Sequence, residues 1–305
     1  MMAVEYYIFM GRDDEEIPPN VTHVRIDISV RVIPERAFSE NPNIEEVEFN
    51  DDITTVERLA FYKCPSLRRV VMRGVKVIKE HTFDECEALT DVECDKLEII
   101  KEYAFTDCKS LIGMDLESVR IVERYAFWRC FALTCANFGS KLERIDRCVF
   151  YGCTSLRCIT LPLKDDVLTS DDIFTQCENL EHVDLVKGVH QTVAALLLEE
   201  WKTVVYKDIH LINQILLNLP NGSHRYRDHG KKSQTIQFWI RSLLHQINKY
   251  KAEHCSYLNE AAATLDLALT KDILFKNVLP FLELPSHIFD GGEDEEEEDS
   301  NDIDD

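Results

Sequence analysis

The chain has 305 residues, of which 45% are hydrophobic and 9% aromatic, and a formal net charge of −22. This apolar content is enough for a large core and excludes wholesale disorder. The negative charge repels a phosphate backbone, so we expect no direct binding to nucleic acid. No uninterrupted apolar run approaches the ~18 residues that a bilayer requires, so we expect no membrane span.

The amino terminus and the cysteines carry information about the compartment. No basic segment precedes the first apolar residues and an acidic run follows them, which argues against a secretory signal. Eleven cysteines in a long chain without a secretory start indicate free thiols in a reducing compartment. We therefore expect a cytoplasmic protein, with the nucleus as an alternative and secretion disfavoured.

Residues 1–21 precede any regular pattern and are expected to form an N-terminal segment or cap. The segment at 24–28 then alternates apolar and polar residues. A period of two is typical of a half-buried strand. We expect this first strand to close the open end of the core.

A repeat of 22 to 24 residues follows and is marked by a recurring phenylalanine. The seven anchors are Phe38, Phe61, Phe83, Phe105, Phe127, Phe150 and Phe174. Cysteine stands three residues after each anchor, with Asn41 in its place in the first unit, and Leu or Ile stands six residues after. Apolar residues also stand nine and eleven residues after each anchor. Seven copies of one pattern indicate a repeat architecture.

The spacing within the unit predicts its local structure. The positions nine and eleven after the phenylalanine alternate as in a strand, and the A-F-x-x-C-x-x-L stretch suits a short helix or turn. A unit of this size cannot bury its apolar face alone, so neighbouring units must stack. Stacking makes the phenylalanines a continuous spine and the cysteines a second ladder. We expect the thiol ladder to be packing rather than a soft-metal site, because free cysteine is commonly buried.

The motif I-x-x-x-A-F-x-x-C-x-x-L-x-x-V-x-L is clearest at 100–108 and 122–130. It resembles the BspA-like leucine-rich repeats of bacteria and unicellular eukaryotes, over residues 22–188. The resemblance implies an α/β repeat fold, a leucine-rich repeat solenoid of about seven coils with one strand per coil on the concave face. Members with a known role generally bind other proteins, and some are regarded as cell-surface adhesins. The family has no shared active site.

Helical spacing replaces the strand pattern after Gly188, so 189–285 is expected to be a helical C-terminal domain. The expected helices lie at 191–201, at 208–219, along a stripe through 236–250 toward 265, and, with a kink, at 271–284. The basic loop at 225–232 is interpreted as solvated, with nucleic-acid contact or an import signal as alternatives. The acidic tail, 286–305, is disordered by composition and serves solubility or binds a basic partner.

The sequence contains no pattern that indicates catalysis or metal binding. It lacks G-x-S-x-G, G-x-x-x-x-G-K-[ST], G-x-G-x-x-G, H-E-x-x-H and paired C-x-x-C motifs. His245 and His254 stand nine residues apart, with no carboxylate at ligand spacing. We therefore predict no enzyme, no catalytic residue, no cofactor and no metal, and an enzyme subunit is the least favoured alternative.

A candidate protein-binding surface follows from the strand pattern. Residues eight, ten and twelve after each phenylalanine should point away from the core, because those at nine and eleven point inward. The candidates are Glu46, Glu48, Arg69, Arg73, Asp91, Glu93, Asp115, Glu117, Asn137, His182 and Asp184. We predict that the four acids from Asp91 to Glu117 bind a basic segment of a protein partner while Arg69 and Arg73 fix its register. The alternative is a solvated sheet face with no partner.

The function predicted from the sequence is that of a non-catalytic scaffold for protein–protein interaction. Repeat arrays commonly bind through an extended strand surface. The alternative is cell-surface adhesion of the BspA-like type, which requires secretion. The sequence leaves the oligomeric state and the identity of the partner open.

Overall fold

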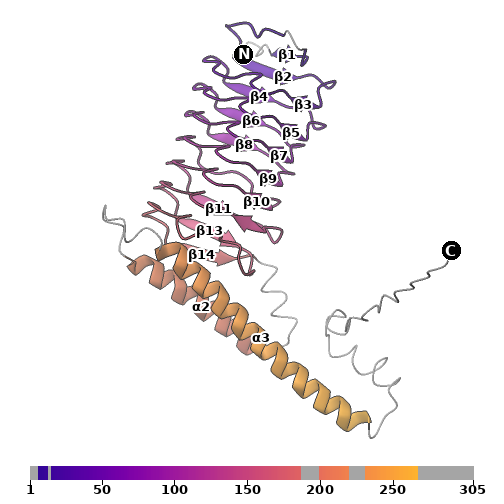
Figure 1. Cartoon of the computed structure of the whole chain (residues 1–305), viewed down its shortest axis with the longest axis vertical. Coiled ribbons are helices and arrows are strands. Elements are labelled where there is room, and N and C mark those ends of the chain that lie inside the picture. Colours follow the sequence, from indigo (N-terminus) through magenta and orange to yellow (C-terminus); the bar gives the residue numbers. More distant parts are fainter. Residues whose placement is uncertain (1–5, 13–14, 187–198, 220–230, 267–305) are drawn as a thin grey trace, which may run out of the picture.

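The structure is a computed structural model that describes residues 6–12, 15–186, 199–219 and 231–266. Its main body is a solenoid whose coils stack along one axis, with two helices lying across the last coil (Figure 1). We number the coils one to seven by their phenylalanine, from Phe38 to Phe174. Strands one repeat apart pair in parallel, so equivalent side chains of neighbouring coils lie side by side. The stacked repeat expected from the sequence is confirmed.

Eight strands follow one another on one side of the coils (Figure 1), and we call their outward surface the strand face. They are β1 (Tyr7–Phe9), β2 (His23–Ile26), β4 (Glu46–Glu48), β6 (Arg69–Val71), β8 (Asp91–Glu93), β11 (Cys135–Asn137), β13 (Cys158–Leu161) and β14 (His182–Leu185). The first five form one sheet and the last three another. The strand expected to be first is therefore second, because β1 pairs with it and adds the buried Phe9 to the core.

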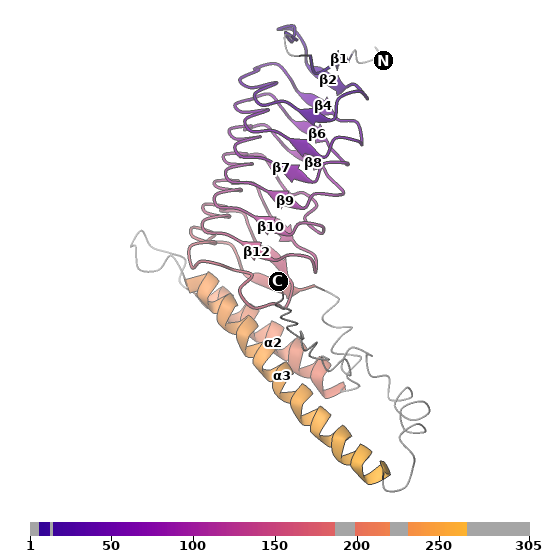
Figure 2. The same cartoon turned by 45° about the vertical axis from the view of Figure 1, so that its right-hand side comes forward.

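A second row of strands runs along the adjacent side of the coils (Figure 2), where the sequence analysis expected only one strand per coil. These are β3 (Val32–Ile33), β5 (Thr55–Val56), β7 (Val77–Ile78), β9 (Ile99–Ile100), β10 (Ile121–Val122) and β12 (Arg144–Ile145). They pair in parallel as a six-stranded sheet. Each has two residues, which is too short for an alternation to show in the sequence.

The A-F-x-x-C stretches are turns rather than short helices. In the first six coils, residues two before and two after the anchor adopt left-handed backbone, as Tyr103 (φ 58°) and Asp107 (φ 53°) do around Phe105. Left-handed residues interrupt a right-handed helix, so the chain reverses within a few residues. The tight reversal lets each anchor point into the core.

The two predicted ladders are present in the core. The rings of the seven anchors stack, and the centroids of Phe83 and Phe105 are 5.2 Å apart. The six ladder cysteines are buried and free. Each donates its thiol proton to the carbonyl of the previous coil's phenylalanine, as Cys108 does to Phe83 at 3.1 Å. The thiols therefore fill the turn and also satisfy a buried backbone acceptor.

The fourth coil departs from the expected strand. Its segment at 113–117 contains no strand and pairs only through a single bridge, between Leu116 and Phe138. Glycine occupies the first strand position, Gly113, and glycine weakens a strand because it has no side chain to pack. This gap separates the two sheets of the strand face. Three residues expected to point outward, Val71, Gly139 and Pro162, are instead buried.

Two helices close the end of the solenoid after the last coil (Figure 1). They are α2 (Glu199–Asn218) and α3 (Lys231–Asp266). The residues predicted to be helical at 199–201 and 208–218 are helical, but the predicted break between them is wrong, because α2 runs through 202–207 without interruption. The predicted stripe on α3 is confirmed, since Ile236, Ile240 and Leu243 are buried.

Part of the predicted basic loop belongs to α3 and is not solvated. The amine of Lys232 is half-buried and donates to the carbonyls of Cys177, Glu178 and Leu180 at 2.8 to 2.9 Å. Burial lowers the pKa of this lysine. Lys232 thus fastens α3 to the backbone of the last coil.

Several predictions lie outside the described residues: the helix at 271–284, the tail at 286–305, and residues 1–5, 187–198 and 220–230. Within the described ranges, neither helix combines the length and apolar character needed to cross a bilayer.

Candidate protein-interaction surface

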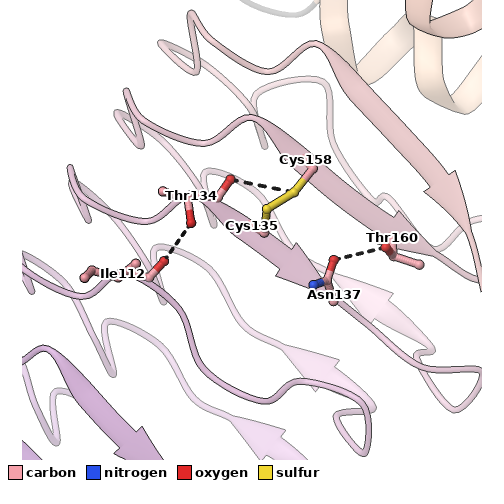
Figure 3. The surroundings of a disulfide bond; sticks show 6 residues. All are labelled: Ile112, Thr134, Cys135, Asn137, Cys158 and Thr160. Carbon is pink, nitrogen blue, oxygen red and sulfur yellow. Dashed lines mark hydrogen bonds between the residues drawn. A yellow bond between two sulfur atoms is a disulfide. The ribbon is translucent and has the colours of Figure 1, made fainter.

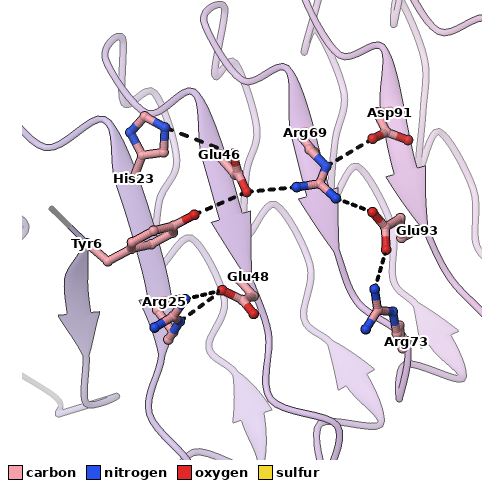
Figure 4. A network of polar contacts seen from close by, with 9 residues as sticks. All are labelled: Tyr6, His23, Arg25, Glu46, Glu48, Arg69, Arg73, Asp91 and Glu93. Carbon is pink, nitrogen blue, oxygen red and sulfur yellow. Dashed lines mark hydrogen bonds and ion pairs between the residues drawn. The ribbon is translucent and has the colours of Figure 1, made fainter. Parts of the chain in front are cut away.

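Arg69 is the centre of a polar network on the strand face (Figure 4). Its guanidinium contacts Glu46 on the preceding strand at 3.1 Å and Asp91 on the following strand at 3.0 Å. It also pairs with Glu93, which in turn accepts from Arg73 at 2.7 Å. One side chain therefore ties β4, β6 and β8 together, because register places these positions side by side. The structure brings these predicted candidates into one cluster.

Three residues that the sequence analysis missed extend the network across β1 and β2 (Figure 4). Arg25 donates two hydrogen bonds to Glu48, at 2.9 and 2.7 Å, and its guanidinium lies 4.5 Å from the ring centroid of Tyr6. The Tyr6 hydroxyl donates to Glu46 at 3.4 Å, and a ring nitrogen of His23 lies 3.9 Å from the same carboxylate. Arg25 was detectable from the sequence, because it stands between the inward-facing residues of the first alternating segment.

The charges of this network largely compensate one another. Hydrogen bonds from Arg73 and Arg69 lower the pKa of Glu93. Its carboxylate in turn raises the pKa of both arginines. Asp91 and Glu93, which the sequence analysis assigned to a basic partner, are thus already ion-paired within the chain. A partner gains less from contacting neutralised carboxylates than free ones.

Three further exposed acids lie beside the network, in the third and fourth coils. Asp95, Asp115 and Glu117 are exposed, and no ion pair joins them to a base in the part of the chain that the structure describes. We call these three residues the acidic patch. The Cys94 thiol donates to the carbonyl of Asp115 at 3.4 Å, which joins the third coil to the fourth. Burial, followed by the charges of Asp115 and Asp95, raises the pKa of Cys94 to about 12.

A shallow hollow of about 300 Å³ lies beside the network at the ends of the first strands. Its lining includes Ile8, Arg25, Ile28 and Glu48. Ile28 is 72% exposed and Ile8 43% exposed, so apolar side chains there face solvent next to the Arg25–Glu48 pair. An apolar hollow with a charged rim is typical of the points where a protein partner anchors.

The remaining candidates lie apart from the network, on the second sheet. Asn137 accepts a hydrogen bond from Thr160 at 3.1 Å. His182 contacts α2, since the amide nitrogen of Asn213 lies 3.0 Å from its Nδ1, while the Asn213 oxygen accepts from Val183 N–H at 2.8 Å. The structure therefore places His182 at the junction with the helix rather than with the charged cluster.

Two cysteines on the strand face contradict the expectation that all cysteines are free. Cys135 and Cys158 form a disulfide between β11 and β13 (Figure 3). The sequence analysis placed both on the outward face but did not consider their pairing. Parallel register makes them direct neighbours, which a spacing of 23 residues equal to the repeat length could have indicated.

The described residues show no arrangement of three or more His, Cys, Asp or Glu side chains that could hold a metal ion. The site consists instead of an extended, polar sheet surface. What such a surface offers chemically is charge and shape for recognition.

The stacked coils, paired sheets and periodic core define a leucine-rich repeat solenoid. A model of the BspA type leucine rich repeat region matches six copies in residues 18–118 and 77–195, which is more than half of the chain. The chain belongs to this family.

Solved structures with the same repeat come from several bacteria. A leucine-rich repeat protein of T. pallidum is 28% identical with a TM-score of 0.43, over 46% of this chain and 68% of that one. One from Bacteroides ovatus is 23% identical with a TM-score of 0.33, over 54% and 55%. A leucine rich cell surface protein from Faecalibacterium prausnitzii is 20% identical with a TM-score of 0.28, over 56% and 75%. Among curated proteins, none matches the chain.

Proposed function

We propose that this protein is a non-catalytic scaffold that binds a protein partner through the strand face of its first four coils. The observation that carries the proposal is the acidic patch of Asp95, Asp115 and Glu117, which forms no ion pair within the described residues and lies beside a network in which the charges pair internally. A basic segment of the partner complements this patch, and charge complementarity sets the specificity and speed of association.

The neighbouring network supports binding by making the surface rigid. Arg69 holds three carboxylates on the two neighbouring strands at fixed positions, so little side-chain freedom is lost when a partner docks. Arg69 and Arg73 thereby fix the register of the partner through the strands they order. The apolar hollow at Ile8 and Ile28 provides a second contact, for an apolar side chain of the same partner.

We place this scaffold in the cytoplasm or nucleus, on the basis of eight free, buried cysteines among the described residues. The Cys135–Cys158 disulfide favours the second candidate function, adhesion at the cell surface, because disulfides persist in oxidising compartments. A fluorescent fusion at native expression level distinguishes the two: signal inside the cell supports the scaffold, and signal at the surface supports adhesion.

The binding proposal is tested with a pair of double charge reversals. Asp115→Lys with Glu117→Lys reverses two of the three charges of the patch, whereas Glu16→Lys with Glu40→Lys makes the same change in net charge at exposed acids off the strand face. Both variants keep the acidic tail, so capture through the tail is equal in the two. We expect proteins captured from native extract to be lost by the first variant and retained by the second. Equal capture by the two variants would exclude the patch as the binding site.

A further inference from the structure

Two cysteines lie outside the core, where packing does not explain them. The eight free cysteines of the described residues are all buried. Cys135 and Cys158 are half-exposed and stand eight residues after their phenylalanine, the position that holds Glu46, Arg69 and Asp91 in other coils. A partly accessible thiol is unusual because cysteine is among the most buried residue types. Their disulfide (Figure 3) therefore needs an account of its own.

The sheet holds the two sulfur atoms within reach of each other in either redox state. Cys135 and Cys158 are register partners on adjacent parallel strands, with Cα atoms 4.8 Å apart, which is the ordinary spacing between strands. The next residues pair in the same register, and Thr160 donates to Asn137 at 3.1 Å. The register thus does not depend on the disulfide, and the two thiols stay neighbours when the bond opens.

Exposure also separates this pair from the other thiols. Burial raises the pKa of Cys177 to about 12 and that of Cys130 further, so the reactive thiolate is scarce in the ladder. The ladder thiols also lie beneath the turns, out of reach of solutes. Cys135 and Cys158 are only partly buried on the strand face, so a small molecule can approach the sulfur atoms there. Exposed disulfides are the ones that exchange readily.

We propose that Cys135 and Cys158 form a reversible thiol–disulfide exchange site whose ligand is a low-molecular-weight thiol or its disulfide. In reduction, the thiolate of one small thiol attacks a sulfur, the protein S–S bond breaks, and the released thiolate takes a proton from water. A second small thiol then attacks the mixed disulfide. The protein gains two thiols and the small molecule leaves as its disulfide, having supplied two electrons. Oxidation is the reverse and uses the small disulfide as oxidant.

Glutathione is the probe for a test on the full chain. The protein is equilibrated in mixtures of reduced and oxidised glutathione, alkylated while folded, and then digested with trypsin for mass spectrometry. One peptide, 130–141, carries both Cys130 and Cys135, so its fragment ions compare a ladder thiol with an exchange thiol directly. We expect reduced glutathione to make Cys135 and Cys158 alkylatable while Cys130 stays unlabelled. Oxidised glutathione should restore the disulfide.

The single variant Cys135→Ser gives a second readout, because Cys158 then has no partner and should carry one glutathione after exposure to oxidised glutathione. Three results would overturn the proposal. The first is a disulfide that reduced glutathione opens only after denaturation. The second is a reduced pair that oxidised glutathione fails to close. The third is labelling of Cys130 as fast as Cys135. The measurements on the unaltered chain stand even if the variant fails to fold.

Discussion

At the scale of single residues, Asp107 is a carboxylate in an unfavourable, partly buried environment. Its Oδ1 is buried and has no hydrogen-bond partner, and the nearest base, Arg129, has its Nη1 3.5 Å away. Burial raises the pKa of Asp107, and the attraction of Arg129 and Lys109 only partly opposes this. At neutral pH the folded protein therefore holds a carboxylate that would be better solvated in the unfolded chain.

We predict that Asp107→Asn raises the urea midpoint at pH 7. Because the folded pKa is raised, the stabilisation from proton uptake is fully present below the unfolded pKa and is lost as pH rises through the folded pKa. The amide does not titrate, so the gain over wild type should vanish at acid pH. Asparagine also tolerates the left-handed backbone of this position. A lower midpoint for the variant at pH 7 would mean that the attraction of Arg129 to the Asp107 carboxylate outweighs the cost of burying that carboxylate.

A larger change in stability is predicted for the phenylalanine spine. Phe105 is fully buried between two stacked neighbours, so Phe105→Ala should cost about 3–5 kcal/mol of unfolding free energy. Ile112→Ala is the control, because Ile112 is 56% exposed and should change stability by less than about 0.5 kcal/mol. Urea denaturation measures both. Similar losses in the two variants would contradict the buried spine.

At the level of single residues, the features that recur with the repeat could be predicted from the sequence. The spine was predicted because phenylalanine recurs seven times, and the thiol ladder because cysteine recurs six times, at intervals of 22 to 24 residues. The partners of Arg69 were not, since the sequence alone does not show that one guanidinium pairs with three carboxylates on the two neighbouring strands at once. The disulfide was missed for a different reason: cysteine occupies only two of the seven equivalent strand positions, so it is an exception to the repeat on which the prediction relied.

At the scale of the elements, the junction between α2 and β14 decides how the solenoid ends. An open last coil would expose its apolar core and the unpaired backbone of β14. Asn213 on α2 meets the second need, because it accepts a hydrogen bond from Val183 N–H, and it also contacts His182. Lys232 on α3 satisfies carbonyls of the same coil. The two helices therefore act as the C-terminal cap.

We predict that Asn213→Ala destabilises the protein by about 1–3 kcal/mol, because it leaves the buried Val183 N–H without an acceptor. Asn213→Asp is the matched control, since it keeps the accepting oxygen and should cost less. Hydrogen exchange at the Val183 amide reports the contact directly and should quicken in the alanine variant alone. Unchanged exchange in both variants would show that the helix does not hold this strand.

Element boundaries were predicted less well than element types. The long stripe of α3 was found because it is strongly periodic, whereas α2 was divided in two at 202–207, which the helix in fact spans. The absent strand of the fourth coil results from Gly113 at a position where other coils carry larger side chains. A single glycine there prevents the strand that the repeat pattern predicts.

On the scale of the whole molecule, the chain is a stack of coils with a strand added at one end and two helices at the other (Figure 1). Each coil touches mainly its neighbours, so a local change is felt over one or two repeats. This organisation leaves one long surface for recognition, with a neutralised network at its start and the acidic patch in the third and fourth coils. The overall repeat was predictable from the sequence. The division of the surface into a neutralised network and an acidic patch was not, because it depends on ion pairs between coils.

The central claim is that the strand face of the first four coils contacts a protein partner. Carboxylate footprinting of the complex captured from native cells tests it, by comparing the labelling of each acid in free and bound protein. We predict protection of Asp95, Asp115 and Glu117 on binding and unchanged labelling of Glu16 and Glu40, which lie off this face. Protection confined to acids outside the strand face, with the acidic patch labelled equally in both states, would contradict the claim.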